Sequence, residues 1–436
     1  MSRSRPSAPP QLTPAQRIDL VLDPGSVAEP QAAGGMTIAR GTVAGRAVLV
    51  AATNPSVARG AIGAAESAGL AAMFQHARAD KIPVVLLLDS SGARVNEGLI
   101  ALGAFRRLFR EALLTRLAAV PMIALLGEAC FGGASMLACV CTRRVYTTQT
   151  RLAASGPGVI EAISGKPQLD AGDAKSIDAL MGGEGRTHTE PTDLLVGPAH
   201  AELRNAVVAC IEDKDGRLVS WNADVAHVVL GMRLRQAGML DDAPAAGALT
   251  AKLNEILPKA YAPVVDADVF SALPPPGSGK PAFMGTLTGA PVGAASCWRL
   301  ADRLLGLRER HATSPVVLML DANGHSTALA DERVMLSSYL VHLSLVIASL
   351  AAAGRRIVLW IPGMASGASY VAFAAPVEQV SVLPAARVEI LPAAAVRQIL
   401  GAEPARPLDI SAMVKAGVAD GLLDSLLQKQ SGLERQ

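Results

Sequence analysis

The sequence is poor in aromatic residues and nearly balanced in charge. Phe, Trp and Tyr make up 3% of its 436 residues, and 40 Lys and Arg residues stand against 38 Asp and Glu, for a net charge of +2. So small an excess of positive charge provides no general attraction to nucleic acid or to an anionic membrane. We therefore expect a chain that binds neither nucleic acid nor membrane.

Paired cysteines, a signal segment and long hydrophobic runs are also lacking. The five cysteines form no C-x-x-C pair, which predicts buried free thiols. The basic, proline-rich start, MSRSRPSAPPQLTP, contains no hydrophobic segment, so residues 1–16 are predicted to be a flexible tail of a cytoplasmic protein. The apolar run 339–354 is shorter than the ~20 residues of a membrane-spanning helix and predicts a buried helix instead.

The sequence repeats itself. Three segments return in the same order: IPVVLLLDSSGARV (82–95) as SPVVLMLDANGHST (314–327), VPMIALLGEACFGGASMLA (120–138) as RIVLWIPGMASGASYVA (356–372), and RGTVAGRAVLVAA (40–52) as MGTLTGAPVGAAS (284–296). Helical patterns are predicted between the paired segments, over 95–117 and 330–353. Apolar strands that alternate with helices predict an α/β fold, duplicated within the chain, whose sheets are covered on both faces.

Composition predicts where the two copies are joined. Proline is scattered before a terminal Pro/Gly cluster, so we expect domains over 17–261 and 282–436 and a linker over 262–281. The segment PPPGSGKP contains the Gly-Lys pair of a phosphate loop but lacks its first glycine and its Ser or Thr. It is therefore interpreted as linker.

Each copy has a strand that ends in a glycine turn before a helix. Gly132 and Gly133 form this turn in the first copy, and Gly367 and Ala368 stand at the equivalent place in the second. The first N–H groups of a helix have no partner within it, and the helix dipole favours negative charge there. The pattern predicts two oxyanion holes for the enolate of a thioester. Close packing of backbones is the alternative for these glycines.

Two further turns carry polar groups. In DSSGARVNEGL, Ser91 and Gly92 can present a hydroxyl and an amide, while Arg94 either holds a carboxylate or phosphate or pairs with Glu97. In SGPGVIEAISG, Gly156 forms a turn. Glu161, in the same segment, either lies near a site or caps a surface loop, and His188 with Glu190 makes too small a set to indicate a metal, so no metal is expected.

These segments carry a family resemblance. LDPGSVAE, DSSGARVNEGL, GEACFGGASMLA and RLAASGPGVIE resemble successive signatures of the β subunit of carboxyltransferases, and in particular of biotin-independent malonate decarboxylases. VVLMLDANG and GMASGASYVAFA are similar to the γ subunit of the same enzyme. The chain is therefore identified as a fusion of β and γ subunits. The resemblance implies two crotonase-like (ClpP/crotonase) ββα-superhelix domains related by internal duplication.

The resemblance also implies an activity: decarboxylation of a malonyl-S-acyl carrier protein to the acetyl thioester and CO₂. The substrate would be carried on a phosphopantetheine or CoA-like arm, with no intrinsic cofactor, metal or biotin. Expected partners are the acyl carrier protein subunit and the acyl-transferase subunit of a complex, with a homodimer left open. The residues expected to bind the two malonyl oxygens are Gly132 and Gly133 for one and Gly367 and Ala368 for the other, and those expected to bind substrate elsewhere are Ser91, Gly92, Arg94, Ser366 and Gly156.

The second copy departs from the family pattern at two places. Pro362 and Gly363 stand where a Lys is expected, and Glu389 where a His is expected. His325 either replaces the missing proton donor or caps a turn. Two alternative functions stay open at this point: a biotin-dependent acyl-CoA carboxyltransferase that uses the same two holes, and a non-catalytic scaffold that binds acyl-CoA or a carrier protein.

Overall fold

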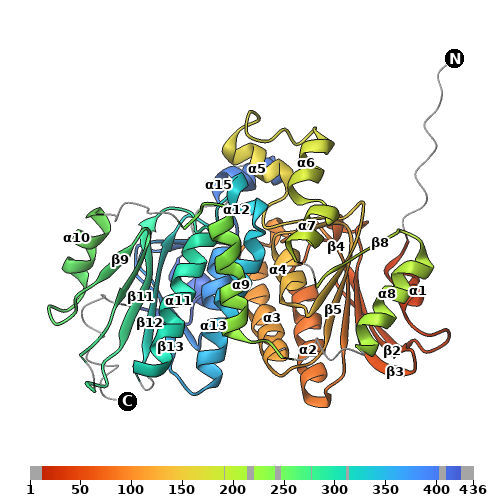
Figure 1. Ribbon diagram of the computed structural model, residues 1–436, viewed down its shortest axis with the longest axis horizontal. Coiled ribbons are helices and arrows are strands. Elements are labelled where there is room, and N and C mark those ends of the chain that lie inside the picture. Colours follow the sequence, from red (N-terminus) through yellow and green to blue (C-terminus); the bar gives the residue numbers. More distant parts are fainter. Residues whose placement is uncertain are drawn as a thin grey trace.

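The computed structural model describes residues 12–190, 192–213, 220–240, 247–275, 277–310, 314–401 and 409–423. These residues form two α/β halves, each built on its own sheet, with helices packed between the sheets (Figure 1). The predicted tail lies outside the described residues up to position 11. The rest of it is not a tail, because α1 (Pro14–Val21) begins there and buries Ile18 and Val21.

The first sheet has eight strands in the order β1-β2-β3-β4-β5-β6-β8, with β7 beside β5. The strands β1 to β3 pair antiparallel with one another, and the remaining pairs are parallel. Parallel neighbours require a crossover connection, which the intervening helices provide. Their bounds are β1 (Ala28–Ala33), β2 (Met36–Val43), β3 (Arg46–Thr53), β4 (Val84–Ser90), β5 (Met122–Phe131), β6 (Arg143–Thr147), β7 (Arg151–Ala153) and β8 (Leu194–Val196).

The second sheet repeats this plan in the order β17-β15-β13-β12-β11-β10-β9, with a two-stranded sheet of β14 and β16 beside it. Again the first strands are antiparallel and the rest parallel. The bounds are β9 (Val264–Asp266), β10 (Val269–Ala272), β11 (Ala282–Gly289), β12 (Val316–Ala322), β13 (Ile357–Ile361), β14 (Met364–Ser366), β15 (Gln379–Val382), β16 (Arg387–Glu389) and β17 (Gly421–Leu422). The predicted duplication of an α/β fold is confirmed.

Two details of the predicted repeat are wrong. Strand β11 pairs with β12 as β3 pairs with β4, so the equivalence of 40–52 with 284–296 is displaced by about one strand. Residues 262–281 are not simply a linker, because β9 and β10 form a hairpin that pairs with β11. Apolar residues of this segment complete the edge of the second sheet, a tertiary contact that composition does not reveal.

The helices of the first half are α2 (Ala64–Asp80), α3 (Leu99–Leu117), α4 (Gly133–Val140), α5 (Pro157–Ser164), α6 (Ala174–Met181), α7 (Gly183–Thr189) and α8 (His200–Glu212), with 3₁₀ turns η1 (Ala58–Gly60) and η2 (Val95–Glu97). The predicted helix over 95–117 is interrupted at Gly98, whose φ is +57°. η2 precedes this glycine and α3 follows it.

The helices that follow are α9 (Ala223–Gln236), α10 (Gly247–Ile256), α11 (Ala294–Arg310), α12 (Leu329–Arg333), α13 (Leu336–Ala352), α14 (Gly367–Ala374), α15 (Ala393–Leu400) and α16 (Ile410–Ala416). The predicted helix over 330–353 is divided into α12 and α13 at Met335, whose φ is +67°. α13 is buried along most of its length, as predicted for its apolar run. No helix among the described residues is long and apolar enough to cross a membrane.

The two halves meet through helices that follow the equivalent glycine turns. Helices α3 and α4 of the first half pack against α13 and α14 of the second, and α5 lies beside α15 above them (Figure 1). The contact is polar as well as apolar: the Oγ atoms of Ser135 and Ser337 are 2.7 Å apart, and Arg106 Nε donates to the carbonyl of Ala374. Both glycine turns therefore lie at one interface.

Candidate active site

A pocket between the halves is lined by both glycine turns. Gly132 and Gly133 reach it from the first half, and Gly367 and Ala368 reach it from the second. The predicted binding residues Ser91, Gly92 and Gly156 also line it, and most of its remaining wall is apolar, with Ile62, Val95, Leu102, Phe105, Phe131, Met136, Val159, Val371, Ile390 and Leu391.

In the first turn, one of the two predicted donors is already engaged. Gly132 has φ +57°, and its N–H donates to the carbonyl of Ala153 at 3.2 Å, which extends the pairing of β5 with β7. The prediction that this amide binds substrate is therefore wrong. Gly133 is the first residue of α4, so its N–H has no acceptor within the helix. A Cβ there would lie 2.7 Å from the Phe105 ring, so a larger residue would have to displace that ring.

A second free amide, missed from the sequence, belongs to Ala93. Ile62 forms a bridge beside it: the Ile62 N–H donates to the carbonyl of Gly92 at 2.8 Å, and the Arg94 N–H donates to the carbonyl of Ile62 at 3.0 Å. This pattern leaves the Ala93 N–H without a partner among the described residues, and Ala93 lines the pocket. An alanine side chain gives no signal for a backbone donor, and only the position in the SSGA turn could have indicated it.

The second half repeats this geometry. Val292 bridges to His325 as Ile62 does to Ala93, with N–H···O distances of 2.9 Å on both sides. Gly367, with φ +55°, begins α14, so its N–H and that of Ala368 lie in a first helical turn without intrahelical acceptors. Each half therefore presents a helix N-terminus and a neighbouring turn to the same pocket.

A carboxylate supports the strand before each helix turn. Asp89 accepts a hydrogen bond from the Ala129 N–H at 3.2 Å, and Asp321 accepts one from the Met364 N–H at 2.9 Å. Gly127 and Gly363 lie directly against these carboxylates, where a Cβ would collide. The departure from the family pattern at 363 therefore has a local reason, since a lysine stem would overlap the Asp321 carboxylate.

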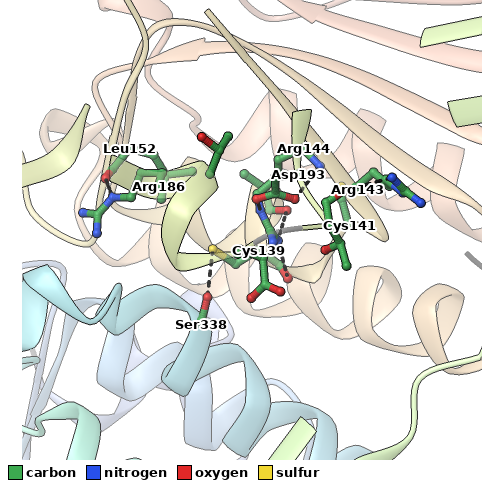
Figure 2. A network of polar contacts seen from close by, with 12 residues as sticks. Cys139, Cys141, Arg143, Arg144, Leu152, Arg186, Asp193 and Ser338 are labelled. Atoms are coloured by element: carbon green, nitrogen blue, oxygen red, sulfur yellow. Dashed lines mark hydrogen bonds and ion pairs between the residues drawn. The ribbon is translucent and has the colours of Figure 1, made fainter. Parts of the chain in front are cut away.

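The far end of α4 is held by a buried cation (Figure 2). Arg144 Nη1 lies 3.5 Å from the carbonyl of Ala138 and 3.4 Å from that of Cys139, the last turn of the helix, and its Nε donates to Asp193 at 2.6 Å. Positive charge stabilises a helix C-terminus, so this pair fixes α4 with its N-terminus toward the pocket. Burial raises the pKa of the Cys141 thiol to about 12, which is typical of an inert structural cysteine.

Two predicted binding residues do not line the pocket. Arg94 forms ion pairs with Glu66 and with Glu97, the latter at 3.4 Å, as the alternative interpretation had it. Ser366 is fully buried, and its Oγ lies near Gly324 with no hydrogen-bond partner among the described residues. Arg94 thus has partners within the fold, and Ser366 is buried away from the pocket lining.

The other polar candidates also have structural partners. Glu161 accepts a hydrogen bond from the Ala171 N–H at 2.6 Å and so caps a loop. His188 Nδ1 lies 2.7 Å from the carbonyl of Glu184, while Glu190 pairs with Arg233 at 3.2 Å. Within the described ranges, no group of three or more His, Cys, Asp or Glu residues is arranged to hold a metal ion.

The assignment of Arg94 can be tested by replacement. Arg94→Ala should lower the free energy of unfolding by about 1–3 kcal/mol, because the carboxylate of Glu66 is left buried without its partner. The KM for a thioester substrate should stay within about twofold. Denaturant unfolding and initial rates measure the two quantities, with Glu66→Gln as the matched change on the other side of the pair. A tenfold rise in KM without loss of stability would return Arg94 to the substrate site.

The two halves of the chain match two different protein families. A carboxyl transferase domain model matches residues 10–194, and a malonate decarboxylase gamma subunit model matches residues 288–428. The chain is 29% identical to the methylmalonyl-CoA carboxyltransferase 12S subunit of Propionibacterium freudenreichii subsp. shermanii, over 36% of this chain and 29% of that protein. It is 33% identical to a putative propionyl-CoA carboxylase beta chain of Bacillus subtilis (strain 168), over 31% of this chain and 27% of that one.

The matched region spans less than a third of the length of either relative. Among solved structures, a Pseudomonas malonate decarboxylase hetero-tetramer in complex with malonate is 26% identical to this chain. That likeness covers 53% of this chain and 91% of the other, with a TM-score of 0.46.

Proposed function

We propose that this chain, which joins a carboxyl transferase domain to a malonate decarboxylase gamma-subunit domain, decarboxylates a malonyl thioester to the acetyl thioester. One observation carries the proposal: equivalent glycine turns of the two halves open on a single pocket. Two groups of a malonyl thioester must be bound during the reaction, the carbonyl oxygen of the thioester and the carboxylate. The duplicated turns provide a separate set of amides for each.

The first half supplies the hole for the enolate. When the bond to the carboxylate breaks, its electron pair moves into the thioester and negative charge develops on the carbonyl oxygen. The N–H groups of Gly133 and Ala93 are the donors we assign to that oxygen. Loss of one such donor typically costs about 2.7–4 kcal/mol of barrier.

The second half holds the carboxylate. We assign Gly367 and Ala368 to it, at the N-terminus of α14, which orients the bond to be broken out of the thioester plane. The wall of the pocket is largely apolar, and among its described lining residues it offers no lysine or arginine. The apolar wall keeps water from the carboxylate, whereas CO₂ is uncharged and needs no hydration, so the surroundings favour its release.

A second hollow gives the carrier arm a route to the pocket. It is lined by Pro55, Arg59 and Asp89, and it shares Ser91, Ala93, Phe131, Gly156 and Val159 with the pocket. We place a phosphopantetheine or CoA-like arm along it, with no intrinsic cofactor or metal. An acyl carrier protein subunit and an acyl-transferase subunit are the proposed partners; the Pseudomonas malonate decarboxylase is itself a hetero-tetramer.

The experiment incubates the purified chain with malonyl-CoA or a malonyl carrier protein and follows CO₂ and acetyl thioester. Release without any biotinylated protein is the expected result. Strict dependence on biotin would support a carboxyltransferase, the activity that the names of the two curated relatives favour. Tight binding without turnover would leave a thioester-binding scaffold.

A further inference from the structure

One ionisable side chain lines the pocket. Among the described residues of its wall, His325 alone carries an ionisable side chain, and the others are apolar residues, glycines and two serines. Burial lowers the pKa of His325 to about 4, so the imidazole is neutral at pH 7. Glu332, which pairs with Arg186, accepts a hydrogen bond from the N–H of Ala154, the residue before Ser155. That pair balances its own charge.

The two ring nitrogens of His325 have different surroundings. Nε2 lies 2.9 Å from the Oγ of Ser155, a residue of the other half that also lines the pocket. Nδ1 is buried without a hydrogen-bond partner in the described part of the chain. It lies beside the turn that begins α14, since a Cβ built on Gly367 would stand 3.6 Å from it. The unpartnered nitrogen is therefore close to the turn assigned to the carboxylate.

The internal repeat shows that this pair occurs once. His325 stands where the first half has Ala93, at the same bridge position. Ser155 precedes the N-cap of α5, and the corresponding residue before the N-cap of α15 is Leu391. The backbone geometry is duplicated, but the acid–base group is not. The pocket thus has a histidine at the end formed by the second half and an alanine at the other.

Resting on the proposed decarboxylation, we propose that His325 delivers from Nδ1 the proton that the α-carbon receives after CO₂ leaves. Ser155 is a positioning residue that holds Nε2 through its hydroxyl. A malonyl carboxylate bound beside the imidazole favours its protonated form, so a proton from solvent enters with the substrate. The bond to the carboxylate then breaks and CO₂ departs, with its electron pair left on the enolate. The Nδ1–H proton forms the new C–H bond, and the imidazole is neutral again.

The reverse of the last step gives a readout that needs no decarboxylation. Neutral His325 should remove an α-proton of acetyl-CoA, so the wild-type protein should exchange those protons with D₂O, as followed by NMR. General acid–base groups contribute about 10²–10⁴-fold, so His325→Gln should slow this exchange at least 100-fold with the Kd for acetyl-CoA within about threefold. Ser155→Ala should slow this exchange roughly tenfold and should lower kcat with little change in KM. This variant provides the test if His325→Gln does not fold.

The matched control is His76→Gln, the same change on the exposed surface of α2, which should leave exchange unaltered. A His325→Gln protein that exchanges and decarboxylates like the wild type contradicts the proton role and leaves the proposed function standing. Proton exchange by a wild type that releases no CO₂ from malonyl-CoA contradicts the proposed function alone. Release of free CoA with an acyl group trapped on Ser155 would make that serine a nucleophile and overturn the inference.

Discussion

Replacing Gly133 with proline should lower the turnover of a malonyl thioester by about 10²–10³-fold, with much less effect on binding. Gly133 is the first residue of α4, a position at which proline is well tolerated because its N–H has no helical acceptor. The change therefore removes one donor from the pocket and little else from the backbone. Steady-state kinetics with malonyl-CoA would show the loss in kcat, as expected for an interaction stronger in the transition state than in the ground state.

The matched control is Gly133→Ala. Both side chains place a Cβ against the ring of Phe105, where it would lie 2.7 Å from Cζ, but alanine keeps the N–H. The ratio of the two variants isolates the amide from the packing. If alanine costs as much as proline, the glycine is required for space, and the donor role assigned to it fails.

Replacing Glu332 with alanine should cost about 3–5 kcal/mol of unfolding free energy, because it breaks a buried ion pair. The side chains of Arg186 and Glu332 are 2% and 3% exposed, their closest atoms are 2.6 Å apart, and they come from different halves. Arg186 also donates to the carbonyl of Leu152 (Figure 2), and Glu332 accepts the Ala154 N–H. Removal of the carboxylate leaves a guanidinium buried without its counter-charge.

Denaturant unfolding measures this cost, and a double replacement serves as its control. Arg186→Met with Glu332→Leu removes both charges and should recover most of the loss, because similar apolar volume fills the site without an unpaired ion. A single variant that loses less than about 1 kcal/mol would place the pair in the class of solvated surface ion pairs. The contact between the halves would then be stabilised mainly by other residues.

The repeat made the general plan predictable from the sequence. Segments with the same apolar run and the same glycine turn fold alike, so β4 and β12 and the helices that begin at Gly133 and Gly367 fall where the repeat places them. Because the two halves pack through the helices that follow those turns, the turns meet in one pocket. Local pattern and symmetry together were sufficient for that.

What the sequence could not show depends on pairing between distant segments or on backbone groups. The amide of Gly132 is occupied because β7, a strand of three residues, pairs with the end of β5. The free amide of Ala93 depends on a single bridge to Ile62. The hairpin within 262–281 is stable only against the edge of β11. The ion pairs of Arg94 and the burial of Ser366 likewise depend on neighbours that no motif specifies.

The most direct measurement is a crystal structure with a malonyl thioester analogue that cannot lose CO₂. Atoms of one bound acyl group should touch main-chain hydrogens from both copies of the repeat, with its carbonyl oxygen about 2.7–3.1 Å from the Gly133 nitrogen and its carboxylate at the start of α14. An analogue seated on one half alone, or one whose carbonyl is held by side chains or water, would contradict the account.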